Sequence, residues 1–191
     1  MDDPALKGLW VPAMSKELHC LAQGKEGVPV GINTIFYLTH DEIRHVPEDC
    51  TIMYARIVID HCPQKDNPNW VCITTGCNLI DYPYKLTTRT ADMVSAKIMW
   101  NSIISTPGDK FGDADIKNMY LKTPRDWYEY MQMPLKVFPD DIISHYNLHK
   151  KAFNGYVYME IWQGMHGLPQ ASILANKLLL QCLGRHGYFK V

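Results

Sequence analysis

The 191-residue sequence has no long apolar run. Its longest one, between positions 51 and 59, is interrupted by Arg56, whereas a membrane-spanning helix needs about 18 or more consecutive apolar residues. We therefore expect no membrane span. The first residues, Met-Asp-Asp-Pro, are acidic where the start of a signal peptide is basic. We expect an intracellular protein of the cytoplasm or nucleus that is not secreted.

An excess of charge of one sign is also lacking. Nineteen basic residues against twenty acidic ones give a formal charge of −1, which excludes a histone-like protein whose whole surface attracts phosphate. A local basic groove remains compatible with this balance. The chain is 47% hydrophobic, so it can bury a core, and its length suits one domain or one and a half.

The cysteines form no dense framework, and in a chain of this length we expect free buried thiols in a reducing compartment. Cys72 and Cys77 lie near His61 and Cys62 in the sequence, but no Cys-x2-Cys pair accompanies them. A structural zinc site is therefore not expected.

In the first half of the chain, apolar spacing predicts a short helix that starts near Ser15 and stops at Gly24. Runs of β-branched and aromatic residues predict three strands, at 34–38, 51–59 and 70–75. The proline- and asparagine-containing segment 62–69 predicts a loop between the last two. We expect a small antiparallel sheet here, with one protruding hairpin.

In the second half, helical and strand patterns alternate. We expect a helix over 93–103, capped by Thr90 or Asp92 and ended by Pro107-Gly108. Further elements are expected as a short strand at 110–116, a strand at 128–133, a helix at 139–148, a strand at 156–162 and a helix at 170–183 with Gly184 beyond it. The order predicts an α+β fold.

Asp113 and Asp115 would share one face of the strand at 110–116, because side chains on a strand alternate. A carboxylate at the end of a strand suits Mg²⁺, which prefers oxygen ligands. Tyr120 lies five residues after Asp115, at a point where we expect the chain to have turned back beside these acidic residues. The alternative is that the two acidic residues are simply solvated.

The segment Gly164-Met-His-Gly-Leu-Pro-Gln170 separates a strand from a long helix, and its glycines and proline predict a tight turn. Gln170 could present its amide to a ligand at the start of that helix, where anions are favoured. The alternative is an ordinary loop between a strand and a helix.

These stretches occur in a particular order along the chain: Asp115-Ile-Lys-Asn-Met-Tyr-Leu, Glu129-Tyr-Met, Gly164-Met-His-Gly-Leu-Pro-Gln-Ala-Ser and Ala175-Asn. Upstream stand Trp10-Val-Pro-Ala-Met-Ser-Lys-Glu-Leu and Tyr54-Ala-Arg-Ile-Val-Ile-Asp. In order and spacing they resemble the reverse transcriptase domain of LTR retrotransposons, most nearly the Ty1/copia type. The resemblance covers nearly the whole chain.

The resemblance implies a fingers lobe over about residues 1–90 and the start of the palm, with returning fingers elements, over about 91–191. It implies an RNA-directed DNA polymerase from a retrotransposon polyprotein, which transfers nucleotides by means of two Mg²⁺ ions. The implied partners are an RNA or DNA primer–template and deoxynucleotides.

By the same resemblance, Asp115 is the catalytic carboxylate that binds metal first, aided by the carbonyl of Ile116, and Asp113 is only its neighbour on the strand. Tyr120 matches the aromatic residue that stacks under the incoming sugar and excludes a 2′-hydroxyl. Gln170 matches the glutamine that contacts the nucleotide. Arg56 matches a fingers arginine that pairs with the triphosphate.

Two departures from the family pattern bear on activity. After the helix that follows Gln170, the 191 residues contain no aromatic-x-Asp-Asp segment, which carries the other two metal carboxylates of the family. Trp70, Cys72 and Cys62 stand where related sequences usually carry arginine, and His166 and Ser172 replace a tyrosine and a glycine.

We therefore predict no polymerase activity for these 191 residues, and hypothesise a decaying genomic copy. Without the catalytic hairpin, a palm sheet would leave an apolar patch exposed and the chain marginally stable. The main alternative is a non-catalytic nucleic-acid-binding remnant. A third reading is an interaction or structural protein without a ligand.

Overall fold

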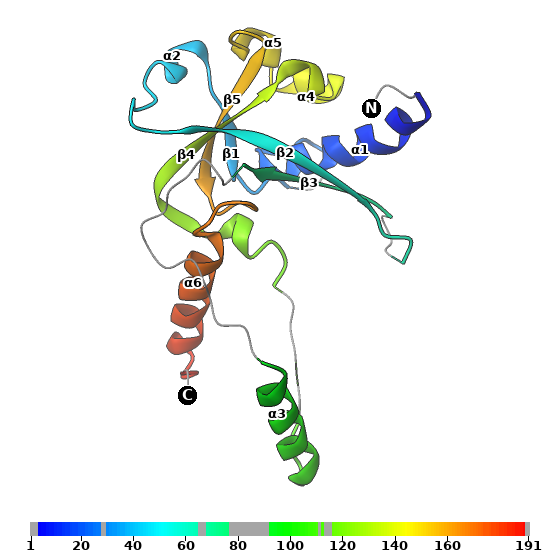
Figure 1. Ribbon diagram of the computed structural model, residues 1–191, viewed down its shortest axis with the longest axis vertical. Coiled ribbons are helices and arrows are strands. Elements are labelled where there is room, and N and C mark those ends of the chain that lie inside the picture. The colour runs from blue at the N-terminus through cyan, green and yellow to red at the C-terminus, as the bar shows by residue number, and fades with distance from the viewer. Residues whose placement is uncertain are drawn as a thin grey trace.

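The computed structural model describes residues 4–27, 30–64, 68–76, 92–110, 112 and 116–189, without the side chains of residues 4–7. Its centre is a curled five-stranded sheet in the order β1-β5-β4-β2-β3 (Figure 1). The strands are β1 (Ile35–Tyr37), β2 (Ile52–His61), β3 (Asn69–Thr75), β4 (Pro124–Pro134) and β5 (Tyr156–Gln163). The expected α+β class is confirmed.

Helices lie at both ends of the sheet. Figure 1 shows α2, α4 and α5 at one end and α6 and α3 towards the other, with α1 beside β3. The helices are α1 (Pro4–Leu21), α2 (His40–Ile43), α3 (Met93–Ser105), α4 (Asp140–His145), α5 (Leu148–Lys151) and α6 (Ala171–Arg185), with 3-10 turns η2 (Tyr120–Lys122) and η3 (Leu135–Val137). No helix in these described ranges is both long and apolar enough to cross a membrane.

The core follows from the two-residue period of the strands. Val157, Met159 and Ile161 alternate along β5 and are fully buried. Across the antiparallel pairing, Met131 lies opposite Met159 and Met133 opposite Val157. Burying such side chains supplies the main driving force for folding, at about 25 cal/mol per Å² of apolar surface.

The predicted helix near Ser15 exists, and the expected residues Met14, Leu18 and Leu21 are buried. Its predicted start was wrong, because α1 begins at Pro4 and runs through Pro12. The apolar spacing located the buried stripe of the helix but not its first turns. Proline inside a helix removes a hydrogen bond and usually marks a boundary, which is why the longer helix was missed.

The hairpin of β2 and β3 is antiparallel, as predicted. The small antiparallel sheet expected from the first half alone was wrong. Strand β1 pairs with β5, placing Ile35 opposite Ile161, and β2 pairs with β4 in parallel. Alternation shows which face of a strand is buried, but it does not select the strand's partner.

Two helix ends also differ from expectation. The helix expected over 139–148 is divided into α4 and α5 at Asn147, which adopts a left-handed conformation with φ of 54°. Gly184 lies inside α6, and the stop is Gly187, with φ of 83°. There the Tyr188 N–H donates to the Leu183 carbonyl at 3.1 Å, which closes the helix as glycine-terminated helices commonly do.

The α3 segment stands apart from the sheet (Figure 1). Asp92 caps it as predicted, accepting a 2.8 Å hydrogen bond from the Ser95 backbone N–H. None of its residues is buried, although the helix carries exposed apolar side chains such as Val94, Ile98 and Ile104.

The strand expected at 110–116 is not seen in the described positions: residues 110, 112 and 116 belong to no strand, and the others lie outside the described residues. The five described cysteines, at positions 20, 50, 62, 72 and 182, are free thiols, as predicted, but the expectation that they are buried was wrong for all except Cys72, and Cys182 is exposed. Cys77 lies outside the described residues.

Candidate functional site

Three segments that are far apart in the sequence meet at the end of β3. They are the last residues of β3, the turn that contains η2, and the loop 164–170 between β5 and α6. The Thr75 N–H donates to the His166 carbonyl at 2.9 Å, and the Gly164 N–H donates to the Thr123 carbonyl at 2.8 Å. The loop is therefore held by backbone hydrogen bonds to both other segments.

The glycines of this loop are required by close approach. A Cβ on Gly164 would lie 2.4 Å from the Tyr120 carbonyl oxygen, and a Cβ on Gly167 would lie 2.4 Å from the Thr75 carbonyl oxygen. Gly167 also has φ of 91°, a conformation that other residues rarely adopt. The predicted tight turn thus exists because the loop presses against two other backbones.

Tyr120 lies at the surface of this junction, with 37% of its side chain exposed. Its ring meets the His166 ring edge to face, with centroids 5.7 Å apart and planes at 87°. Burial lowers the pKa of His166, so this imidazole is neutral at neutral pH and contributes no cation.

Gln170 is the N-cap residue of α6 and is fully buried. Its amide nitrogen donates to Glu129 Oε1 at 3.2 Å, so the amide points to strand β4. Its own Oε1 has no hydrogen-bond partner among the described residues. A buried carbonyl of this kind favours a donor, because leaving it unpaired costs about 1–3 kcal/mol.

Glu129 collects further partners that the sequence did not indicate. Arg125 Nη2 lies 2.9 Å from Glu129 Oε1, and the Arg125 side chain is fully buried. The Trp127 indole N–H donates to the same oxygen at 3.2 Å. Strand β4 has an irregular register between Pro124 and Glu129, which breaks simple alternation. The available hint in the sequence was that Arg125 and Glu129 carry opposite charges and stand four positions apart.

Arg56 lies on β2 and is exposed. It donates from Nη2 to the Tyr54 hydroxyl at 2.8 Å, with its guanidinium 5.3 Å from that ring. The Tyr54 ring covers Gly76, where a Cβ would lie 2.7 Å from a ring atom. Arg56 is thus linked through Tyr54 and Gly76 to the segment that the loop crosses.

The structure brings Tyr120 and Gln170 to one junction and places Arg56 on the adjacent hairpin. Ile116 is 48% exposed, and its carbonyl accepts a 3.2 Å hydrogen bond from the Met119 N–H. Asp113 and Asp115 lie outside the described residues. Within the described ranges, no group of three His, Cys, Asp or Glu side chains could hold a metal ion.

No protein-family model, curated protein or solved structure matches this chain. The contacts at this junction and the order of the sequence motifs are therefore the grounds on which a function is inferred.

Proposed function

We propose that these residues form the fingers lobe and the beginning of the palm of a reverse transcriptase domain of Ty1/copia type. The ancestral activity is RNA-directed DNA synthesis. The supporting observation is the packing of loop 164–170 against the turn that carries Tyr120. The family resemblance requires these two segments to share a nucleotide pocket, although they are distant in the sequence.

In the proposed pocket, the half-exposed Tyr120 ring lies under the sugar and excludes a 2′-hydroxyl by steric contact. The Arg56 guanidinium offers paired N–H donors to phosphate oxygens. The resemblance assigns Gln170 to contact with the nucleotide, but here its side chain is fully buried and its amide is held by Glu129, so we propose that Gln170 positions loop 164–170 at the pocket.

The resemblance assigns Mg²⁺ to Asp115 together with two further carboxylates. The described residues offer no cluster of three ligands, and the 191 residues contain no Asp-Asp pair after Gln170. Asp115 itself lies outside the described residues. We propose nucleotide and primer–template binding for this chain and keep the sequence-based prediction that these 191 residues do not synthesise DNA.

Discrimination between dGTP and GTP tests the pocket. Calorimetric titration of the full chain should show dGTP binding at least about tenfold more tightly than GTP, since a well-shaped pocket rejects one added group by that order. Tyr120→Ala should bring the ratio close to one, and Arg56→Gln should weaken both nucleotides. Arg44→Gln, at the exposed residue that follows helix α2, is the matched control and should change neither. Equal affinities in the wild type would refute the assignment of Tyr120.

A primer-extension assay tests the absence of synthesis. With a primed RNA template, deoxynucleotides and Mg²⁺, we expect no product from the 191-residue chain. Appreciable extension would overturn this part of the proposal. Salt-dependent binding to the primer–template without affinity for free nucleotide would favour the non-catalytic nucleic-acid-binding alternative.

A further inference from the structure

Two helices at the same end of the molecule expose apolar side chains. None of the residues of α3 is buried, and among the described residues no helix or strand packs extensively against it. Its exposed large apolar side chains are those of Met93, Val94, Ile98, Met99, Trp100 and Ile104. A helix of 13 residues is only marginally stable in water without packing, so α3 gains stability from an apolar surface that covers it.

Helix α6 carries a second exposed apolar surface. Its buried residues all lie within its first five positions, whereas Leu180 and Leu183 further along are 41% and 38% exposed. Tyr188 and Phe189, which follow the helix, are 68% and 78% exposed. The part of α6 that points away from the sheet therefore also lacks an apolar cover among the described residues.

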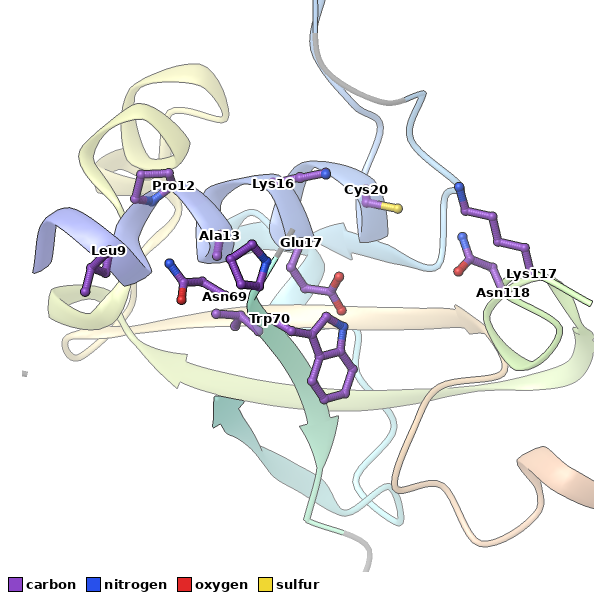
Figure 2. A pocket seen from close by; sticks show the side chains of 12 residues that line it. Leu9, Pro12, Ala13, Lys16, Glu17, Cys20, Asn69, Trp70, Lys117 and Asn118 are labelled. Atoms are coloured by element: carbon purple, nitrogen blue, oxygen red, sulfur yellow. The ribbon is translucent and has the colours of Figure 1, made fainter. Parts of the chain in front are cut away.

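The groove between α1 and β3 is a different kind of surface. It has a volume of about 460 Å³, and Figure 2 shows the charged side chains of Lys16, Glu17 and Lys117 among those that line it. The strand beside it is covered, since Val71 is 3% exposed. Inside α3, by contrast, Lys97 is the only charged residue. The cores of protein interfaces are depleted of charged residues, which favours α3 and α6 over this groove as a protein-binding surface.

The directions of the two helices favour a second copy of the chain as the partner. Figure 1 shows α3 and α6 both running away from the sheet, so within one copy they would pack in parallel, with like ends of their dipoles together. In a two-fold dimer, α3 of one copy lies antiparallel to α6 of the other, which brings opposite ends of the dipoles together. A two-fold axis makes this contact twice, because both copies use the same surfaces.

The charges fit the same pairing. Asp92 and Asp109 flank α3, while α6 carries Lys177 and Arg185 and no acidic residue. An antiparallel arrangement brings Arg185, at the end of α6, near Asp92, at the start of α3 in the other copy. The formal net charge of −1 adds little repulsion between the copies.

The exposed apolar area suits a dimer. An aromatic side chain buries about 150–250 Å² when it is fully covered, and Trp100, Tyr188 and Phe189 are 51%, 68% and 78% exposed. Covering these three in both copies would bury roughly 800 Å². With the aliphatic side chains of the two helices, the total reaches the order of 1,200 Å², the lower end of specific interfaces. The dimer is therefore expected to be weak.

We propose that the chain forms a two-fold dimer in which α3 of each copy packs antiparallel on the exposed part of α6 of the other. At protein concentrations well below the dissociation constant, the chain is a monomer whose α3 is unpacked. The dimer does not depend on the proposed nucleotide binding, because Arg56 and Tyr120 belong to neither helix and Gln170 precedes the exposed part of α6.

Sedimentation equilibrium of the full chain at about 1 to 100 µM tests the dimer. We expect a reversible monomer–dimer equilibrium, with helical circular dichroism rising as the dimer forms, because α3 becomes packed. Ile98→Glu on α3 and Leu180→Lys on α6 should each weaken the dimer at least about tenfold, because each places a charge in an apolar contact. Val30→Glu, at a loop position that is 88% exposed, is the matched control and should leave the dimer unchanged.

Mixing the two variants tests the pairing of α3 with α6. In the mixed dimer one of the two contacts is unsubstituted, and the other joins the two substituted positions with opposite charges. The mixture should therefore dimerise more tightly than either variant alone. Both variants should keep the wild-type melting temperature at low protein concentration, which checks that they are folded.

Four results would overturn the proposal. They are a wild-type chain that stays monomeric up to about 100 µM, dimers that neither variant weakens, a mixture that associates no better than the single variants, and association that continues beyond the dimer.

Discussion

Helix α3 (Met93–Ser105), which we call the arm, and the five-stranded sheet with the elements packed on it, which we call the body, carry similar apolar side chains in opposite environments. In the sheet, Met131, Met159 and Ile161 are fully buried, whereas Ile98 and Ile104 on α3 are 65% and 85% exposed. Figure 1 shows the arm extending away from the strands. Local signals such as the Asp92 cap specify a helix, but a helix of this length depends on packing for most of its stability.

The exposed apolar side chains of α3 must be distinguished from the exposed apolar patch that the sequence predicts. The apolar patch predicted from the sequence belongs to the palm sheet beside Asp115, which lies outside the described residues. The exposed apolar side chains of α3 are a different feature. Substitutions of buried residues in the sheet should therefore lower the stability strongly, and matched substitutions on α3 should have little effect.

The largest effect is expected for a core deletion. Ile161→Ala should lower the free energy of unfolding by about 4 kcal/mol, because a fully buried side chain is replaced by a cavity. Ile104→Ala is the matched change in the arm and should alter it by less than about 0.5 kcal/mol. Urea denaturation followed by circular dichroism measures both. Similar losses for the two variants would mean that α3 is packed in solution.

The next effect concerns the buried ion pair beneath Gln170. Glu129→Gln removes the charge that faces the buried Arg125 and should destabilise the body by about 3 kcal/mol. The exposed pair of Asp41 and Arg44 is the control, and Asp41→Asn should cost less than about 1 kcal/mol. An unchanged melting temperature for Glu129→Gln would show that Arg125 does not need this partner.

A third pair of variants separates crowding from backbone strain. Gly167 and Gly108 have almost the same φ, 91° and 89°. An added Cβ would meet the Thr75 carbonyl at Gly167 and nothing within 4 Å at Gly108, beyond the end of α3. Gly108→Ala should therefore cost about 1 kcal/mol from φ alone, and Gly167→Ala about 2–3 kcal/mol. Thermal melts should show the difference. Equal losses of stability in the two variants would show that the close contact with the Thr75 carbonyl does not contribute.

Much of the fold was predictable because its signals are local. The strand at 156–162 was predicted and is found as β5, and the two candidate caps Thr90 and Asp92 indicated the start of α3. The partner of β1 was not predictable, because Ile35 and Ile161 meet only when the sheet forms. The extension of α1 was hidden by Pro12, which the helix tolerates.

The candidate site was less accessible to sequence reasoning. Tyr120 and Gln170 were singled out from their places in the sequence, at a turn and at the start of a helix, but their nucleotide-binding roles came from the resemblance and remain predictions. The inward hydrogen bond of Gln170 depends on Glu129, which an irregular β4 register brings into place. Glu17 carried no sequence signal, because its environment is created by β3, a distant part of the chain.

The smallest expected effect is a pH dependence confined to the body. Burial is the main cause that lowers the pKa of His19, which packs α1 against Asp141 at 3.4 Å. The unfolded chain then takes up a proton first, so this group costs stability as the pH falls below about 6.5. Glu17 acts oppositely, because its pKa is raised from 4.5 to about 7 and its contribution is lost as the pH rises between those values.

In the wild type the two contributions oppose each other between pH 4.5 and 6.5, so its stability should depend on pH differently from that of either variant. Glu17→Gln should expose the loss at low pH due to His19, and His19→Gln should expose the loss towards pH 7 due to Glu17. Hydrogen bonds from the Ser95 backbone and hydroxyl lower the pKa of Asp92, so the cap of α3 stays ionised at pH 5 and above. Urea titrations at pH 5, 6 and 7 measure the slopes, and a pH-dependent change in α3 helicity over that range would contradict the confinement of the effect to the body.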